Sequence, residues 1–243
     1  MDFAPDDFLH PGARACAGSP VWRWTHLAAV GAALFATSAI ADPIGDAGGM
    51  ALVGPAKKIG HKEVRLETRR GAAPGAAWQV EPISLLTSFT VRFRFSLAAG
   101  TFPQADGIAL VIQTDGTGAI GEGGGGIGYM GLNGVASVIQ TYFNNHVGLN
   151  LDSNPYNTKN SPADLGSASL VEGGETVSYD AVAHVLTMRG KLMVDGVEYD
   201  VHDRKDVDLA SLLGSDTATI GLTGGTGANT ALERVSTFRF AID

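Results

Sequence analysis

The sequence has almost no cysteine, since Cys16 is the only one among its 243 residues. Cys16 precedes the export cleavage site predicted below, so the mature chain is expected to contain no disulfide and no cysteine-ligated metal. Basic residues are also scarce, with 17 Lys and Arg against 25 Asp and Glu and a formal net charge of −8. Nucleic-acid binding needs clustered basic residues. The short pairs Lys57-Lys58 and Arg69-Arg70 are interpreted as solvated turn residues. A nucleic-acid partner is therefore not expected.

Long hydrophobic runs are absent too. The longest apolar stretch, Leu27 to Ile40, has about fourteen residues, and a membrane-spanning helix needs about twenty. Arg14 and Arg23 precede this stretch, and the small-x-small sequence Ala39-Ile40-Ala41 follows its core. This order of basic, apolar and small residues is typical of a secretory signal peptide.

Residues 1–41 are thus predicted to be a signal peptide, and residues 42–243 to be one exported domain, extracellular or periplasmic. A buried core helix is the alternative for the apolar stretch. The segment Met1 to Pro20 is long and acidic for the start of a signal, so translation starting near Val21 is a second alternative.

Two-residue alternation dominates the remainder of the chain. From Ser88 to Leu97 apolar and polar residues alternate without a break, which is typical of a half-buried strand. Asp195-Gly196 lies between two such runs and predicts a tight hairpin turn. The only predicted helix is short, around Val207 to Leu213. Many short strands with glycine-rich turns predict an all-β sandwich.

The residues best suited to bind a ligand lie in and beside a glycine-rich stretch between two apolar strands. Asp106 stands at the head of a predicted central strand, and a carboxylate can accept hydrogen bonds from two hydroxyl groups. Gly121 to Gly128 allow a ligand to approach the backbone closely. Tyr142 and Asn144 add an aromatic face and an amide. Together these groups favour a polyhydroxylated ligand.

Four segments resemble, in order and spacing, the L-type (legume-like) lectins in the form found in bacterial secreted proteins. They are Ala105-Asp106-Gly107, Gly128-Tyr129-Met130-Gly131-Leu132, Thr141-Tyr142-Phe143-Asn144 and the small-residue loop Gly224 to Thr230. The resemblance covers about residues 45 to 243. It implies a concanavalin-like jelly-roll sandwich of two antiparallel sheets, and a non-catalytic protein that binds a glycan or glycoconjugate.

The resemblance also implies a role for each site residue. Asp106 would accept from two sugar hydroxyls, Gly128 would donate its backbone N–H, Asn144 would donate its amide, and Tyr142 would stack on the sugar. The fourth binding loop would include Gly227, Ala228 and Asn229.

The metal-binding strand departs from the pattern of these lectins. Their two metal-ligating acids are replaced by Val138 and Gln140, and a loop that carries a third acid is missing. Asn144 and His146 are the weak remnants of the metal site. Calcium takes six to eight oxygens, several of them anionic. The sequence therefore predicts no cofactor, with calcium expected only if Glu122 or Asp152 substitutes. The family's cis Ala-Asp bond, here Ala105–Asp106, would either become trans or be held by other hydrogen bonds.

Four other interpretations remain open. Asp106 could satisfy a turn, and the glycine stretch could be a loop without a ligand. The chain could be a lectin-fold module that has lost sugar binding and serves in adhesion or matrix structure. It could also be a glycoside hydrolase, although hydrolysis needs two carboxylates about 5–9 Å apart, and Val138 to Tyr142 contain none.

The first prediction concerns processing. Exported protein should begin at Asp42, because Ala39-Ile40-Ala41 is the small-residue site before it. N-terminal sequencing of secreted material checks this prediction. A chain that starts well before residue 40 would contradict export by this signal.

Overall fold

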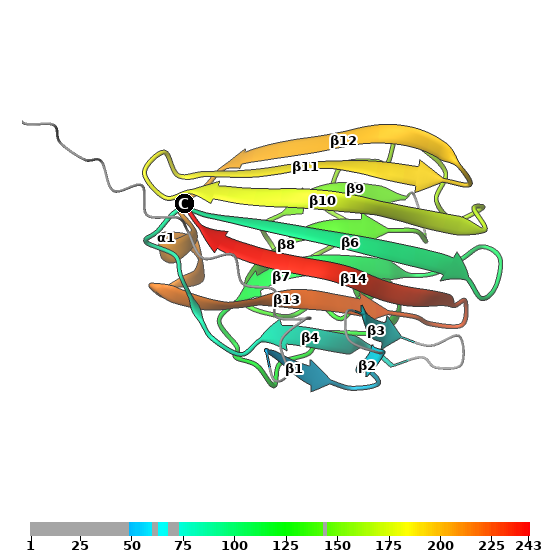
Figure 1. Cartoon of the computed structure of the whole chain (residues 1–243), viewed down its shortest axis with the longest axis horizontal. Helices are drawn as coiled ribbons and strands as arrows, with labels where there is room; N and C mark the ends of the chain where they lie inside the picture. The colour runs from blue at the N-terminus through cyan, green and yellow to red at the C-terminus, as the bar shows by residue number, and fades with distance from the viewer. Residues whose placement is uncertain (1–48, 60–62, 68–72, 143–144) are drawn as a thin grey trace, which may run out of the picture. The chain divides into compact units, whose positions relative to one another are not determined.

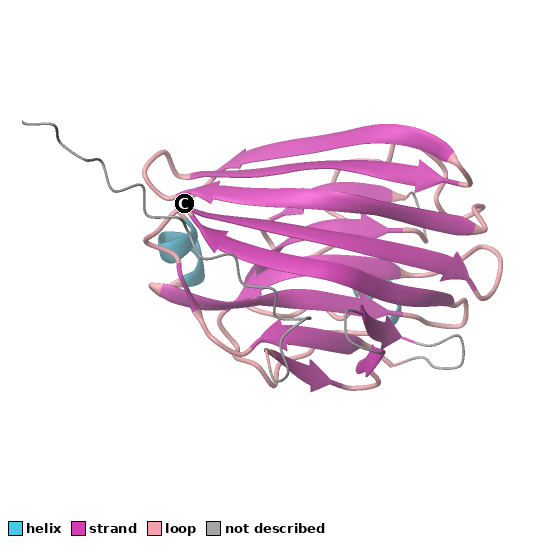
Figure 2. Cartoon of the chain, in the orientation of Figure 1, coloured by secondary structure: helices cyan, strands magenta, loops and turns pink. Residues whose placement is uncertain are grey.

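The described part of the chain forms two stacked antiparallel β-sheets of seven strands each (Figures 1 and 2). The computed structural model describes residues 49–59, 63–67, 73–142 and 145–243. The predicted signal segment, residues 1–41, lies outside this range. The all-β sandwich expected from the sequence is confirmed.

The first sheet has the strand order β1-β4-β13-β7-β8-β9, and β5 pairs with one end of β13. Its strands are β1 (Met50–Val53), β4 (Gly75–Gln79), β13 (Thr217–Gly225), β7 (Gly107–Gln113), β8 (Gly134–Gln140), β9 (His146–Asn150) and β5 (Ile83–Ser84).

The second sheet has the order β12-β11-β10-β6-β14-β3-β2. Its strands are β12 (Val197–Asp206), β11 (Val185–Val194), β10 (Leu170–Asp180), β6 (Phe89–Ala99), β14 (Ala231–Ile242), β3 (Glu63–Glu67) and β2 (Lys57–Ile59). A bulge at Ser236 shifts the pairing of β14 with β6.

Alternation in β6 explains how the second sheet meets the core. Phe89, Val91 and Phe93 are buried, whereas Arg92 and Arg94 between and beyond them are exposed. Successive side chains of a strand point to opposite faces. The apolar set therefore packs between the sheets, and the arginines lie on the outer face of the second sheet.

Strand β7 is buried on both faces, as its continuous apolar sequence predicts. Ile108, Leu110 and Ile112 belong to the core between the sheets. Ala109 and Val111 belong to a second cluster on the other face of the first sheet. Ile127, Tyr129 and Leu132 cover this cluster, so the glycine-rich segment packs onto the sheet.

The local turn signals are confirmed as well. Helix α1 (Leu209–Leu213) begins after Asp208, whose carboxylate accepts the Ser211 N–H, and ends at Gly214 in the left-handed conformation. Asp195 and Gly196 have φ values of 47° and 87°, as a two-residue hairpin between β11 and β12 requires. Over the ranges that the structure covers, no helix has the length and apolarity to cross a bilayer.

One polar contact joins the sheets through the core. Glu175 of β10 is 2 % exposed, and the Ser137 hydroxyl of β8 donates to its carboxylate at 2.7 Å. Burial raises the pKa of Glu175 to about 7, and the bond from Ser137 only partly offsets this rise. The sequence reading did not single out this residue.

The second prediction follows from Glu175. The folded state holds its proton more tightly than the unfolded state, where the pKa is near 4.5. Its stabilising contribution is therefore complete below about pH 4.5 and is lost as the pH rises towards about 7, a change of roughly 3 kcal/mol. Between these limits Glu175→Gln should flatten the pH dependence of the unfolding free energy, measured with denaturant.

The Gln variant keeps an acceptor for Ser137, so it should also be the more stable protein at about pH 8. Asp106 also has a raised pKa and contributes in an overlapping window, so both proteins are compared in an Asp106→Asn background. Equal slopes with and without Glu175 would contradict the assignment.

Candidate functional site

Strand pairing places Asp106 at one rim of the first sheet. Gly107, the first residue of β7, pairs with Gly225 at the end of β13 and with Gln140 at the end of β8. The Asp106 N–H donates to Gly225 O at 3.0 Å, and Asp106 O accepts from the Thr141 N–H at 2.8 Å. The Ala105–Asp106 peptide bond is cis. Three adjacent strand ends therefore fix the backbone of Asp106.

The Asp106 carboxylate is buried but not fully bonded. The residue is 4 % exposed, and its Oδ2 atom has no hydrogen-bond partner. Burial raises its pKa to about 6, against the opposing effect of a hydrogen bond from the Gly227 backbone. A buried acceptor without a donor costs stability. This oxygen is thus an acceptor that a ligand hydroxyl could satisfy.

Two glycine-containing segments approach this oxygen with bare backbone. A Cβ atom placed on Gly124, which has a φ of 57°, would lie 3.9 Å from Asp106 Oδ2. A Cβ on Gly227 would lie 3.3 Å from the same atom. The short 3-10 turn Gly124–Gly126 and the loop after β13 therefore border the carboxylate, as the sequence analysis expected for residues 224–230.

The other predicted site residues differ in burial and in whether their polar groups are already hydrogen-bonded. Tyr142 is half-buried and follows Thr141 directly at the end of β8. The Gly128 N–H donates to Glu122 O at 2.8 Å, so it already serves the internal structure of the loop. Asn144 lies outside the described residues, and its predicted amide role stays a prediction.

The loop after β13 contains the remaining three predicted site residues. Gly227 is half-buried, and its N–H contacts the Asn229 carbonyl at 3.1 Å besides bonding to Asp106. Ala228 is exposed. The Asn229 side-chain amide donates to Pro103 O at 2.7 Å, which ties this loop to the segment before Asp106.

Tyr156 is a site residue that the sequence reading missed. A Cβ on Gly125 would overlap its hydroxyl, so the phenol lies against the glycine turn. Burial and the negative charge of Asp106 both raise the pKa of Tyr156. The residue is 39 % exposed, enough for a ligand to contact it. The segment from Asn154 to Leu165 was interpreted only as a surface loop, and nothing in its local sequence signals contact with Gly125.

His146 has a role within the fold. Its Nδ1 atom lies 3.2 Å from Thr158 O, and its ring meets Tyr156 edge to face with centroids 6.4 Å apart. These contacts hold the loop that carries Tyr156 next to β9. Within the described residues His146 thus supports the site from one side.

Comparisons with solved structures agree with the two-sheet fold. A lectin from Bauhinia forficata, in complex with GalNAc, superposes with a TM-score of 0.68 at 20 % identity, over 85 % of this chain and 99 % of its own. Peanut lectin gives a TM-score of 0.71 at 18 % identity over 86 % and 98 % of the two chains. Arcelin-5, a lectin-like defense protein from Phaseolus vulgaris, gives 0.68 at 17 % identity over 86 % and 99 %.

The chain has the legume lectin fold. No protein-family model matches the sequence. At these identities the likeness establishes the concanavalin-like sandwich, and the chemistry of the site has to be argued from the residues of this chain.

The residues at the expected metal position do not fit a calcium ion. Val138 belongs to the apolar cluster beneath Ile127 and Tyr129. The Gln140 amide donates to Gly125 O at 2.7 Å and so presents a donor rather than an anion. Asp152, one candidate substitute, already accepts bonds from the amides of Asn150 and Asn157. The described residues contain no group of three or more His, Cys, Asp or Glu suited to a metal.

The third prediction is that chelation leaves stability almost unchanged. A metal that binds only the folded state at a hundred times its dissociation constant would stabilise it by about 2.7 kcal/mol. For a chain of this size that is roughly 5–10 °C in melting temperature. EDTA should instead shift the calorimetric midpoint by less than about 1 °C. A chelator-induced drop of about 5 °C, restored by calcium, would show that a metal site exists.

Proposed function

We propose that the protein is a secreted carbohydrate-binding protein that binds a glycan at Asp106 without catalysing a reaction. The observation that carries this proposal is the unsatisfied Asp106 Oδ2 atom between two bare-backbone segments. A carboxylate in this position can accept from sugar hydroxyls, and a charged acceptor makes the stronger hydrogen bonds. Tyr142 and Tyr156 supply aromatic surface for the C–H face of a sugar.

Galactose-type sugars are the first ligands to test. The Bauhinia forficata lectin with the same fold is in complex with GalNAc, and another legume lectin, UEA-II, is complexed with galactose. In this chain Gly124, Gly227 and the Asp106 carboxylate would surround the sugar hydroxyls, and Asn144 would add its amide. The Gly128 N–H would have to release Glu122 O in order to donate to a ligand.

The non-catalytic part of the proposal rests on the acids that β8 lacks. A glycosidase needs two opposed carboxylates, and the face of β8 next to the site carries Val138 and Gln140. We therefore expect no release of reducing ends from any glycan that the protein binds.

A lectin-fold module without sugar binding is the second candidate. Two observations favour it: the Gly128 N–H is already bonded, and arcelin-5, described as lectin-like, shares the fold. Such a module could serve in surface adhesion or matrix structure. A broad glycan array with no bound sugar would make it the better interpretation.

The fourth prediction tests Asp106 directly. Asp106→Ala should abolish binding to whichever glycan the wild type selects, because charge-assisted bonds are worth about 1.5–3 kcal/mol each. Asp106→Asn, which preserves the volume, should weaken binding by about tenfold or more. Wild-type binding should also weaken as the pH falls through about 6, since protonation removes the charged acceptor. Isothermal titration calorimetry measures all three effects.

The matched control is Asp216→Ala. Asp216 is exposed and immediately precedes β13, at the end of that strand remote from Gly225. The substitution therefore removes one carboxylate far from the site. The glycan affinity of this variant should equal that of the wild type. Unchanged glycan binding in folded Asp106→Ala would overturn the proposed site.

A further inference from the structure

The pairing of the second sheet gathers arginines that lie far apart in the sequence. Arg92 on β6 pairs with Arg239 on β14 and with Thr176 on β10, and Thr176 in turn pairs with Arg189 on β11. Arg94 lies two residues along β6 on the same outward face. Neighbouring strands are about 4.8 Å apart, so the row from Arg239 to Arg189 spans roughly 15 Å.

These four residues, Arg92, Arg94, Arg189 and Arg239, form what is called here the arginine patch. All four are exposed, and within the described residues none has a carboxylate within ion-pair distance, unlike Lys191, Arg204 and Arg234. Like charges directly opposite on neighbouring strands destabilise a sheet, and Arg92 faces Arg239 in this way. The chain carries a net charge of −8, yet within the described residues the acids on this face, such as Glu172 and Asp200, form no ion pair with the four arginines.

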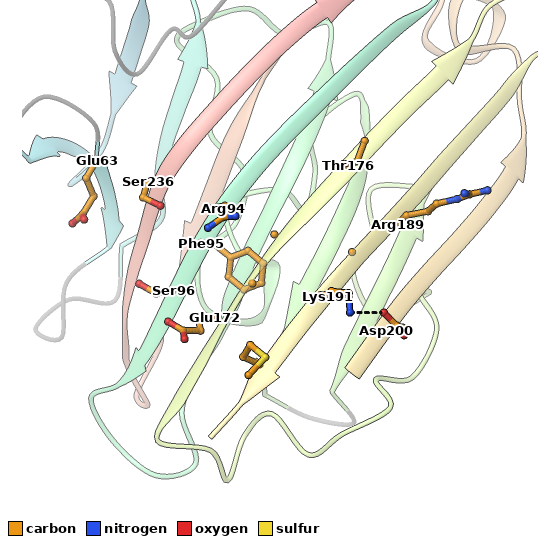
Figure 3. A pocket seen from close by; sticks show the side chains of 14 residues that line it. Glu63, Arg94, Phe95, Ser96, Glu172, Thr176, Arg189, Lys191, Asp200 and Ser236 are labelled. Atoms are coloured by element: carbon orange, nitrogen blue, oxygen red, sulfur yellow. Dashed lines mark ion pairs between the residues drawn. The ribbon is translucent and has the colours of Figure 1, made fainter. Parts of the chain in front are cut away.

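A hollow of about 790 Å³ opens beside the patch on the same face of the sheet (Figure 3). Gly174 lies between Arg94 and Lys191 in the paired row and presents no side chain there. Figure 3 shows Arg94 and Arg189 from two strands at this hollow, with Glu172 and Asp200 also on its lining. Phe95 lies beneath Gly173, where an added Cβ would approach its ring to 3.2 Å.

The mixture of groups at the hollow selects the ligand. Guanidinium groups bind carboxylates bidentately, whereas Glu172 and Asp200 would accept hydrogen bonds from hydroxyls and repel a polyanion as densely charged as duplex DNA. The outward positions of the described strands of this sheet carry no Phe, Tyr or Trp ring for stacking nucleic-acid bases, and their one imidazole is that of His202, which pairs with Arg189. The fitting ligand therefore bears both acid groups and hydroxyls.

We propose that the outer face of the second sheet is a second binding site, which takes an acidic polysaccharide whose uronate carboxylates pair with the arginine patch. Hydroxyls of the same sugars bond to Glu172 and Asp200 across the hollow. This site is separate from Asp106, since its residues belong to the other sheet and the opposite face of the sandwich. It therefore does not depend on the glycan site proposed above.

The test uses alginate as the acidic polysaccharide and its propylene glycol ester as the neutral counterpart. All binding is measured by calorimetry on the Asp106→Ala variant, so that the first site cannot contribute. Alginate should bind, its affinity should fall as salt rises, and the ester should bind at least tenfold more weakly. Arg92→Gln with Arg189→Gln should reduce alginate affinity by tenfold or more.

Two variants serve as controls. Lys57→Gln removes one positive charge at the far edge of the same sheet, on β2, and is compared with Arg189→Gln alone. Only the arginine variant should weaken binding. Arg189→Lys keeps the charge but loses the planar fork, so its affinity should fall between those of wild-type Arg189 and Arg189→Gln. All these positions are exposed, and thermal unfolding of each variant verifies the fold.

Four results would overturn the proposal. The first is that alginate does not bind. The second is that Lys57→Gln and Arg189→Gln lower the alginate affinity equally. The third is that duplex DNA or phosphatidylserine vesicles bind as tightly as alginate does. The fourth is sedimentation showing that the arginine variants dissociate an oligomer, because the patch would then be an interface between copies of this chain.

Discussion

Strand β7 is buried on both faces, and it can hold that position only in one register against β13 and β8. A slip of one residue would exchange Ile108 and Leu110 with Ala109 and Val111, which would place large side chains where the glycine-rich segment packs and leave the inter-sheet core underfilled. The same register brings three strand ends together at Asp106. The position of the candidate site is therefore a consequence of core packing on both sides of one strand.

Hydrogen bonds and apolar contacts organise the loops around Asp106, at positions where the resemblance to legume-like lectins would place metal-ligating acids. The Gln140 amide holds Gly125 O, the Asn229 amide holds Pro103 O, and Val138 supports Ile127 from below. An amide and a valine need no counter-ion. The order of the site is thus built into folding of the chain itself.

Local features were predictable from the sequence, and long-range ones were not. The alternation of β6, the Asp195-Gly196 turn and the place of Asp106 at the head of a strand all follow from periods and turn chemistry within a few residues. Tyr156 reaches Gly125 from a loop whose own sequence signals only a surface position. Its role depends on tertiary packing, which a single sequence does not encode locally.

The arginine patch is a second feature that could not be predicted from the sequence alone. In the sequence Arg92, Arg189 and Arg239 look like isolated outward residues of separate strands in an acidic chain. Only the pairing of four strands turns them into one row. The absence of a basic run therefore excludes a linear basic motif, but it does not exclude a basic surface.

Both candidate sites share one physical sign, a polar group without a partner at the rim or on the outer face of the sandwich. Asp203 is also buried, but it is paired with Lys159. Glu175 has one oxygen without a partner as well, but it lies in the core between the sheets, where Ser137 donates to its other oxygen. Asp106 Oδ2 has no donor, and Arg92 faces Arg239 with no acid between them. A fold retains groups that cost stability chiefly where something outside the chain can satisfy them. The unsatisfied oxygen is suited to hydroxyl donors and the opposed arginines are suited to acid groups, so the rim at Asp106 and the outer face of the second sheet fit different ligands.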